Sequence, residues 1–224
     1  MVTVTLTSIP PRFATLGPQI ETLLAQHPDR LCLTIPHSYR RFRDWDGTLP
    51  KLPAGAVVLR TRDYGPATKF AAVFDHHPKA DILIADDDCD YGPGWLASFR
   101  TARDRHPNAV IAASSFDTGR LGLPPGHRVV QGFAGLLLCP ADIGPPDLSA
   151  DDPAIWVDDI WLSARIAAAG LPVIACPEAR AAVAPSTSPA ALQDAVIDGE
   201  TRATLNRLVA RDLQSRFRVW QIPG

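Results

Sequence analysis

The sequence predicts an α/β protein with a mostly parallel central sheet covered by helices on both faces. Short apolar runs bounded by Pro, Gly or Asp alternate along the chain with stretches whose apolar residues have helical spacing. This alternation is typical of parallel sheets, whose strands are buried on both faces. The chain has 224 residues, 46% of them apolar, so we expect a single domain over residues 1–224.

The first half of the chain shows the alternation most clearly. Its expected strands are runs of apolar residues, and the first of them alternates apolar residues with threonine. Its expected helices carry apolar residues on one face, and the last one stops at Pro107. In chain order these elements are a strand at 2–6, a helix at 16–24, strands at 31–35 and 56–60, a helix at 70–74, a strand at 82–85, a helix at 95–106 and a strand at 109–113.

Glycine and proline divide the second half of the chain. Gly132 separates two apolar runs, and Gly170 with Pro172 forms a helix stop signal. The expected elements are a loop at 121–126, strands at 129–130 and 133–138, a loop at 140–153, a helix at 160–168 and a long amphipathic helix at 192–217, within a C-terminal helical segment at about 189–218.

Charge and composition exclude several classes of function. Lys and Arg number 22 against 24 Asp and Glu, so the near-neutral chain is not expected to bind nucleic acid. No basic segment leads into an apolar helix, and no apolar run approaches the ~18 residues of a membrane span, which predicts a cytoplasmic protein. The four cysteines form no CxxC pair, so neither a disulfide nor a zinc site is expected.

An aspartate triplet, Asp86, Asp87 and Asp88, directly follows the expected strand at 82–85. Ligands bind beyond the carboxyl ends of strands in such sheets, so this triplet lies where chemistry is expected. Crowded carboxylates raise one another's pKa, and a hard divalent cation with oxygen ligands keeps them ionised together. The triplet therefore indicates Mn²⁺ or Mg²⁺. The alternative is a solvated turn whose aspartates cap the helix that begins near Gly94.

A second acidic pair, Asp158 and Asp159, opens the expected helix at 160–168. Acids in a first turn gain ~0.3–1 kcal/mol from the helix dipole, which is reason enough for their presence in an ordinary helix. A transferase also needs a base or a charge-stabilising group opposite its metal. The two acidic clusters together favour that catalytic interpretation.

Cations and hydroxyls accompany these acids. Lys69 is expected in a first helical turn after Gly65 and Pro66, where a cation opposes the helix dipole and a bound diphosphate would relieve the conflict. Ser8 and Arg12 follow the first strand, at a position suited to holding a nucleotide. A solvated lysine and an ordinary loop are the alternatives. None of the six histidines shows a metal-ligand spacing.

Five segments in this order resemble small, non-processive bacterial glycosyltransferases of the family-2-like group, which have the GT-A fold. The resemblance covers roughly residues 2 to 175 and rests on Leu6-Thr7-Ser8-Ile9-Pro10-Pro11-Arg12-Phe13, Asp63-Tyr64-Gly65-Pro66-Ala67-Thr68-Lys69, Asp86-Asp87-Asp88, Gly132-Phe133-Ala134-Gly135 and Asp158-Asp159-Ile160-Trp161. It implies transfer of one sugar from a nucleotide-sugar donor, with a UDP-sugar the first expectation, to a hydroxyl of a glycan or other acceptor.

The resemblance also implies roles for particular residues. Asp86 would face the ribose and share the metal with Asp88, while Asp158 or Asp159 would lie near the acceptor hydroxyl and act as base if the enzyme inverts. The implied donor-binding residues are Thr7, Ser8, Pro10, Arg12, Lys69, Asp86 and Asp87.

The chain departs from the broad family at two places. The expected second strand ends in Ile35-Pro36, where many relatives carry an acid that contacts the base, so the base stays open. Residues 214–217 lack the Gln-x-x-Arg-Trp signature of processive synthases, which favours single-sugar transfer. The terminal helix packs on the core or forms a homodimer interface.

Three other interpretations are open. A sugar nucleotidyltransferase would also use paired aspartates, but it usually carries a Gly-rich phosphate loop after the first strand, and none is present here. A haloacid dehalogenase-like phosphatase would place its Asp-x-Asp nearer the start of its core. A catalytically silent module that binds a nucleotide-sugar or glycan is the third.

Overall fold

The computed structural model describes residues 1–149, 151–186 and 201–221. In this part of the chain, a seven-stranded sheet has the strand order β3-β2-β1-β4-β7-β6-β8. Its strands are β1 (Val2–Thr7), β2 (Arg30–Pro36), β3 (Ala56–Thr61), β4 (Asp81–Ile84), β6 (Val110–Asp117), β7 (Arg128–Leu138) and β8 (Val173–Ala175).

The central sheet is mostly parallel, as predicted. Strands β3, β2, β1 and β4 run parallel to one another, and β6 runs parallel to β8. Strand β7 is antiparallel to both β4 and β6. The carboxyl ends of β1 and β4 therefore meet at one edge of the sheet. The loop after β1 and the aspartate triplet after β4, which were both expected to hold a nucleotide, start from that edge.

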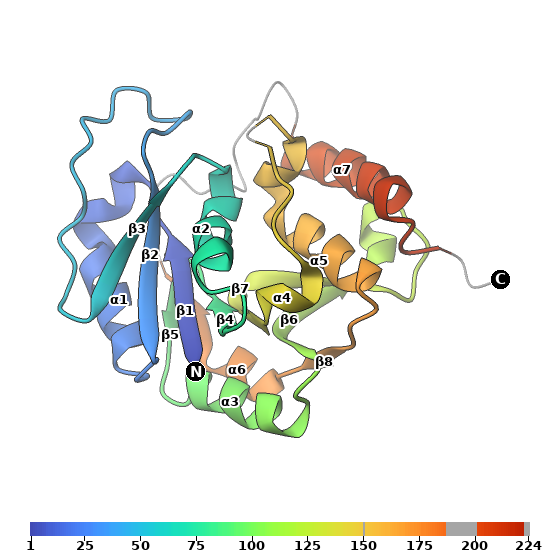
Figure 1. The fold of residues 1–224 in the computed structure, drawn as a ribbon, viewed down its shortest axis with the longest axis horizontal. Coiled ribbons are helices and arrows are strands. Elements are labelled where there is room, and N and C mark those ends of the chain that lie inside the picture. The colour runs from blue at the N-terminus through green and yellow to red at the C-terminus, as the bar shows by residue number, and fades with distance from the viewer. Residues whose placement is uncertain (150, 187–200, 222–224) are drawn as a thin grey trace.

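Helices cover both faces of the sheet (Figure 1). Along β4, Ile82 and Ile84 point into one apolar core, and Leu83 points into the other, because successive strand side chains alternate between faces. The first core contains residues of α2 (Thr68–His76), α5 (Asp158–Ala168) and α7 (Arg202–Phe217). The second contains residues of α1 (Leu16–Leu24), α3 (Trp95–Arg105) and α6 (Pro177–Ala181).

The two strands expected around Gly132 are one continuous strand, β7. Its pairing with β6 jumps from Gln131 opposite Ser114 to Leu136 opposite Ala112, so β7 carries extra residues over this stretch. Gly135 lies within that irregularity with φ +115°, a conformation that side-chain-bearing residues rarely adopt. The glycines thus mark a bulge in one strand, whereas the prediction placed a break between two strands there.

The structure adds elements that the sequence did not predict. A second, two-stranded sheet joins β5 (Cys89–Tyr91) to β9 (Val183–Pro185) just after the aspartate triplet. The region 140–153, expected to be a loop, begins with a short helix, α4 (Pro140–Ile143), and its last residue starts the 3-10 helix η4 (Pro153–Val157). Of the helix expected at 192–217, the structure shows α7 from Arg202; residues 189–200 of the expected C-terminal segment lie outside the described residues.

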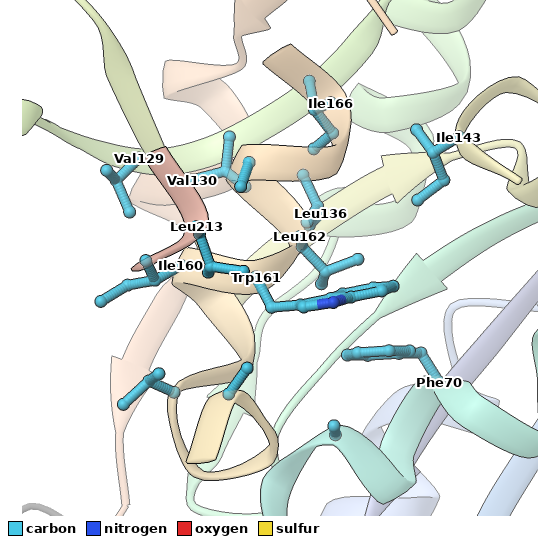
Figure 2. Packing of buried hydrophobic residues seen from close by; sticks show 14 of the residues in the cluster. Phe70, Val129, Val130, Leu136, Ile143, Ile160, Trp161, Leu162, Ile166 and Leu213 are labelled. Carbon is cyan, nitrogen blue, oxygen red and sulfur yellow. The ribbon is translucent and has the colours of Figure 1, made fainter. Parts of the chain in front are cut away.

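Aromatic stacking in the first core holds α2 against α5. Phe70 of α2 and Trp161 of α5 stack with ring centroids 5.6 Å apart and an interplanar angle of 11°. Figure 2 shows the two rings lying face to face between the helices. Phe70 follows Lys69 directly, and Trp161 lies two residues after Asp159. The stack therefore fixes the helix turns that carry the expected site residues relative to one another.

Candidate active site

A cleft of about 610 Å³ opens at the carboxyl ends of β1 and β4. The structure brings the expected site residues together in its wall, although they come from four separate parts of the chain. Those lining the cleft are Thr7, Ser8, Arg12, Lys69, Asp86, Asp87, Asp88, Asp158 and Asp159. Pro10 is the exception: it begins the 3-10 helix η1 (Pro10–Thr15) and does not line the cleft.

Asp87 is held by the loop that follows β1. Ser8 Oγ donates to Asp87 Oδ2 at 2.5 Å, and Arg12 Nη1 forms an ion pair with Asp87 Oδ1. Burial raises the pKa of Asp87 to about 6, against the opposing effect of the Arg12 charge. Tyr39 Oη in turn donates to the Ser8 carbonyl at 2.7 Å. Arg12 and Asp87 thus neutralise each other and fix the loop against the triplet. The Thr7 hydroxyl is already bonded to the Thr34 carbonyl at 2.7 Å.

Lys69 connects the two acidic clusters. Its Nζ lies 2.7 Å from Asp86 Oδ1 and 2.8 Å from Asp158 Oδ2, and only 4% of the residue is exposed. Burial lowers the pKa of Lys69, but the charges of Asp158 and Asp86 outweigh that effect and raise it well above its usual range. The Lys69 charge opposes the helix dipole, and the carboxylates of Asp86 and Asp158 offset that charge. A bound diphosphate was expected from the sequence to do so.

Asp159 is held against β7. Its Oδ1 accepts a hydrogen bond from the Gly132 N–H at 2.9 Å, and its own carbonyl accepts one from Ser163 Oγ at 2.6 Å. Burial, and then the neighbouring Asp158 charge, raise the pKa of Asp159 to about 7. A carboxylate with this pKa can take up a proton near neutral pH.

Asp88 and Asp86 are the more exposed members of the triplet, with side chains 35% and 28% exposed. Asp88 Oδ2 lies 3.4 Å from Arg12 Nη1. Burial raises the pKa of Asp86, against the opposing Lys69 charge. Among the residues described, no cluster of at least three His, Cys, Asp or Glu side chains could hold a metal alone. Two carboxylates in one cleft nevertheless suit a hard cation that completes its shell with substrate oxygens.

The acids do not act as ordinary helix caps. Helix α3 begins after Gly94 without a side-chain capping bond, and strand β5 lies between it and the triplet. The N-cap of α5 is Val157, and the Asp158 and Asp159 side chains contact Lys69 and Gly132 respectively. The alternative that the triplet caps α3 is therefore wrong, whereas Asp158 and Asp159 do lie in the first turn of α5, where the helix dipole favours acids.

Several residues of the site carry no signal in the sequence. Tyr91 Oη accepts the Asp86 N–H at 2.8 Å and donates to the Phe133 carbonyl at 2.8 Å, so it fixes the start of the triplet. Ser186 and Arg202 also line the cleft, far along the chain from either acidic cluster. No local pattern marks them, because their position depends on tertiary contacts.

No helix in the described ranges is both long and apolar enough to cross a membrane. No family model and no curated protein sequence matches this chain.

Solved structures do match. One is a mannosyltransferase from Pyrobaculum calidifontis in complex with GDP-Man and Mn²⁺, with a TM-score of 0.51 and 14% identity, over 80% of this chain and 55% of that one. This chain thus spans about half the length of that enzyme. Another is 2-C-methyl-D-erythritol 4-phosphate cytidylyltransferase from Thermus thermophilus, with a TM-score of 0.51 and 18% identity, over 94% of this chain and 98% of that one. The fold is the nucleotide-diphospho-sugar transferase, or GT-A, type.

Proposed function

We propose that this chain is a divalent-metal-dependent glycosyltransferase that moves one sugar from a nucleoside-diphosphate sugar to an acceptor hydroxyl. One observation carries the proposal: two acidic clusters, 70 positions apart, meet in one cleft and share the buried Lys69. The first cluster follows a parallel strand, where nucleotides bind in α/β folds. The second supplies a carboxylate whose pKa lies near neutrality. The resemblance to family-2-like glycosyltransferases supports the same function.

The nucleoside end of the donor is assigned to the β1 side of the cleft. Ser8, Arg12 and Asp87 form a fixed, neutral group there, and Thr7 adjoins it. Tyr39 and Phe42 line the same side and give an aromatic wall for a base. Pro10 contributes indirectly, by starting the 3-10 helix that presents Arg12.

Asp86 and Asp88 would hold Mn²⁺ or Mg²⁺, with donor phosphates supplying further oxygen ligands. The ion would supply charge neutralisation for the departing nucleoside diphosphate. Lys69 offsets the negative charges of Asp86 and Asp158, because its ammonium group lies between them. Without the Lys69 ammonium group, the carboxylates of Asp86 and Asp158 would repel one another in the cleft.

Asp159 is the proposed general base. The acceptor oxygen forms a bond to the sugar's anomeric carbon while the bond from that carbon to the phosphate oxygen breaks. The nucleoside diphosphate leaves with the bonding electron pair, and the acceptor's proton goes to Asp159. The Gly132 N–H donates a hydrogen bond to one carboxylate oxygen of Asp159. The Asp159 carboxyl has a pKa of about 7, which suits proton uptake at physiological pH.

Nucleotidyl transfer is the second candidate, favoured by the likeness to the cytidylyltransferase over nearly the whole of both chains. The loop after β1, Ser8-Ile9-Pro10-Pro11-Arg12, lacks the glycines of a phosphate-binding loop and instead ties Arg12 to the triplet. The products separate the candidates, because glycosyl transfer releases a nucleoside diphosphate and nucleotidyl transfer releases pyrophosphate.

The test begins with binding. Thermal unfolding is measured with a panel of nucleoside diphosphates and nucleotide-sugars, with and without Mn²⁺, for the wild type, Asp88→Ala and the control Asp90→Ala. Asp90 is exposed and lies outside the cleft. We expect a metal-dependent rise in Tm with one nucleotide, lost in Asp88→Ala and kept in Asp90→Ala. The absence of any shift in the wild type would refute the proposal. Metal-dependent binding without donor hydrolysis or transfer would leave a silent binding module.

A further inference from the structure

The cations of the cleft fall into two groups. Four basic side chains line it: Arg12, Arg41, Lys69 and Arg202. Arg12 is paired with Asp87 and Asp88, and Lys69 with Asp86 and Asp158, so their charges are already balanced. Among the described residues, neither Arg41 nor Arg202 has a carboxylate within ion-pair distance. Arg41 is exposed and lies over the Phe42 ring, so Arg202 is the one partly buried cation of the cleft that has no counter-charge within the described part of the chain.

Arg202 is the first residue of α7, at the rim of the cleft. Its Nη1 is buried and has no hydrogen-bond partner within the described structure. A buried guanidinium nitrogen without an acceptor is unfavourable, and native proteins nearly always satisfy such groups. A planar guanidinium is also the group best suited to hold two oxygens of a phosphate at once.

Ser186 provides a second unsatisfied donor in the same cleft. Its N–H donates to the Asp88 carbonyl at 2.9 Å, which places the residue directly beside the candidate metal-binding carboxylate. Its Oγ is buried and, like Arg202 Nη1, has no partner among the described groups. Two unsatisfied donors therefore line the cleft that holds both acidic clusters, each in a residue that belongs to neither cluster.

We infer that Arg202 and Ser186 form a subsite for the phosphoryl groups of the nucleotide, with Arg202 supplying the charge and Ser186 a hydrogen bond beside Asp88. The inference rests on the proposed function, because it assumes that a nucleotide occupies the cleft. An anionic, oxygen-rich ligand satisfies both donors and the unbalanced charge together. Neither a base nor a neutral sugar would balance the charge of Arg202.

Calorimetric titration of UDP, GDP and the matching nucleosides, with Mn²⁺ present, tests the subsite. For the diphosphate that binds the wild type, Arg202→Gln is expected to weaken binding roughly 10- to 100-fold, the range for a lost hydrogen bond to a charged group. Ser186→Ala is expected to weaken it about 3- to 10-fold. The matching nucleoside should bind both variants as it binds the wild type.

Arg207→Gln is the matched control, because Arg207 is an exposed arginine on the same helix, outside the cleft. Arg202→Lys keeps the charge and should recover part of the lost affinity; it also serves if the glutamine variant does not fold. Unchanged diphosphate affinity in Arg202→Gln, or an equal loss for nucleoside and diphosphate, would overturn the subsite. Failure of the wild type to bind any nucleotide would instead refute the proposed function.

Discussion

Replacing Asp159 with Asn should make the protein more stable and, at the same time, inactive. In the folded protein the Asp159 carboxyl accepts the Gly132 N–H and lies beside Asp158. An asparagine amide oxygen can accept the same hydrogen bond, but the side chain cannot ionise. The substitution therefore removes a buried negative charge while it keeps the local geometry.

The magnitude follows from the pKa of Asp159, which rises from 3.8 to about 7 on folding. Between these values the folded protein keeps a proton that the unfolded chain has released, so wild-type stability falls as the pH rises through this interval. Each pKa unit corresponds to about 1.4 kcal/mol, so the advantage of Asp159→Asn grows from about 2 kcal/mol at pH 5 to about 4 kcal/mol at pH 8.

Urea unfolding of metal-free wild type and Asp159→Asn, at pH 5 and pH 8, gives the two differences directly. The exposed Asp90→Asn serves as control and should show no such growth with pH. Glycosyl transfer measured on the same samples should be lost in Asp159→Asn. If the stability difference is equal at both pH values, or if the variant is less stable at pH 8, the reasoning about the buried charge is wrong.

Three further predictions concern the same site. Lys69→Met leaves two carboxylates without their shared cation and should lower the free energy of unfolding by about 3–5 kcal/mol, measured by denaturant titration; a loss below ~1 kcal/mol would contradict the bridge. Gly65→Ala should destabilise the fold by about 1–3 kcal/mol in the same assay, because Gly65 has φ +53° and an added Cβ would meet a tryptophan ring carbon at 2.8 Å. Gly17→Ala in α1, where a Cβ meets nothing within 4 Å, should be neutral or stabilising. The rate of transfer should fall about tenfold per pH unit below 7, as Asp159 becomes protonated, and a flat pH–rate profile from 5.5 to 7 would exclude it as base.

Hydrophobic periodicity predicted the main strands and helices because burial on both sheet faces demands apolar runs there. Periodicity did not predict elements that form only by pairing with a segment distant in the sequence. Strands β5, β8 and β9 have three residues each, too few for a periodic signal, and they form by pairing with remote segments. Gly132 misled the prediction because a glycine in an apolar run indicates a bulge as readily as a break.

The acidic clusters of the site could be predicted, since each lies next to a recognisable element boundary. Their connection could not, because the contact between Lys69 and both clusters depends on how α2 and α5 pack over the sheet. Nothing in the sequence singles out Ser186 or Arg202 either. Each lies far along the chain from both clusters and enters the cleft through tertiary structure alone.

The shared ammonium group of Lys69 also constrains how this site can change over generations. Replacing Asp86 or Asp158 alone changes the net charge around Lys69, so the effects of such substitutions on stability are not additive. Exchanging all three for apolar residues of similar volume removes the charges together and can leave the fold intact. A stepwise change of the chemistry at this site therefore passes through less stable intermediate sequences unless the three positions change together. The three positions are therefore energetically coupled, although they lie on three separate segments of the chain.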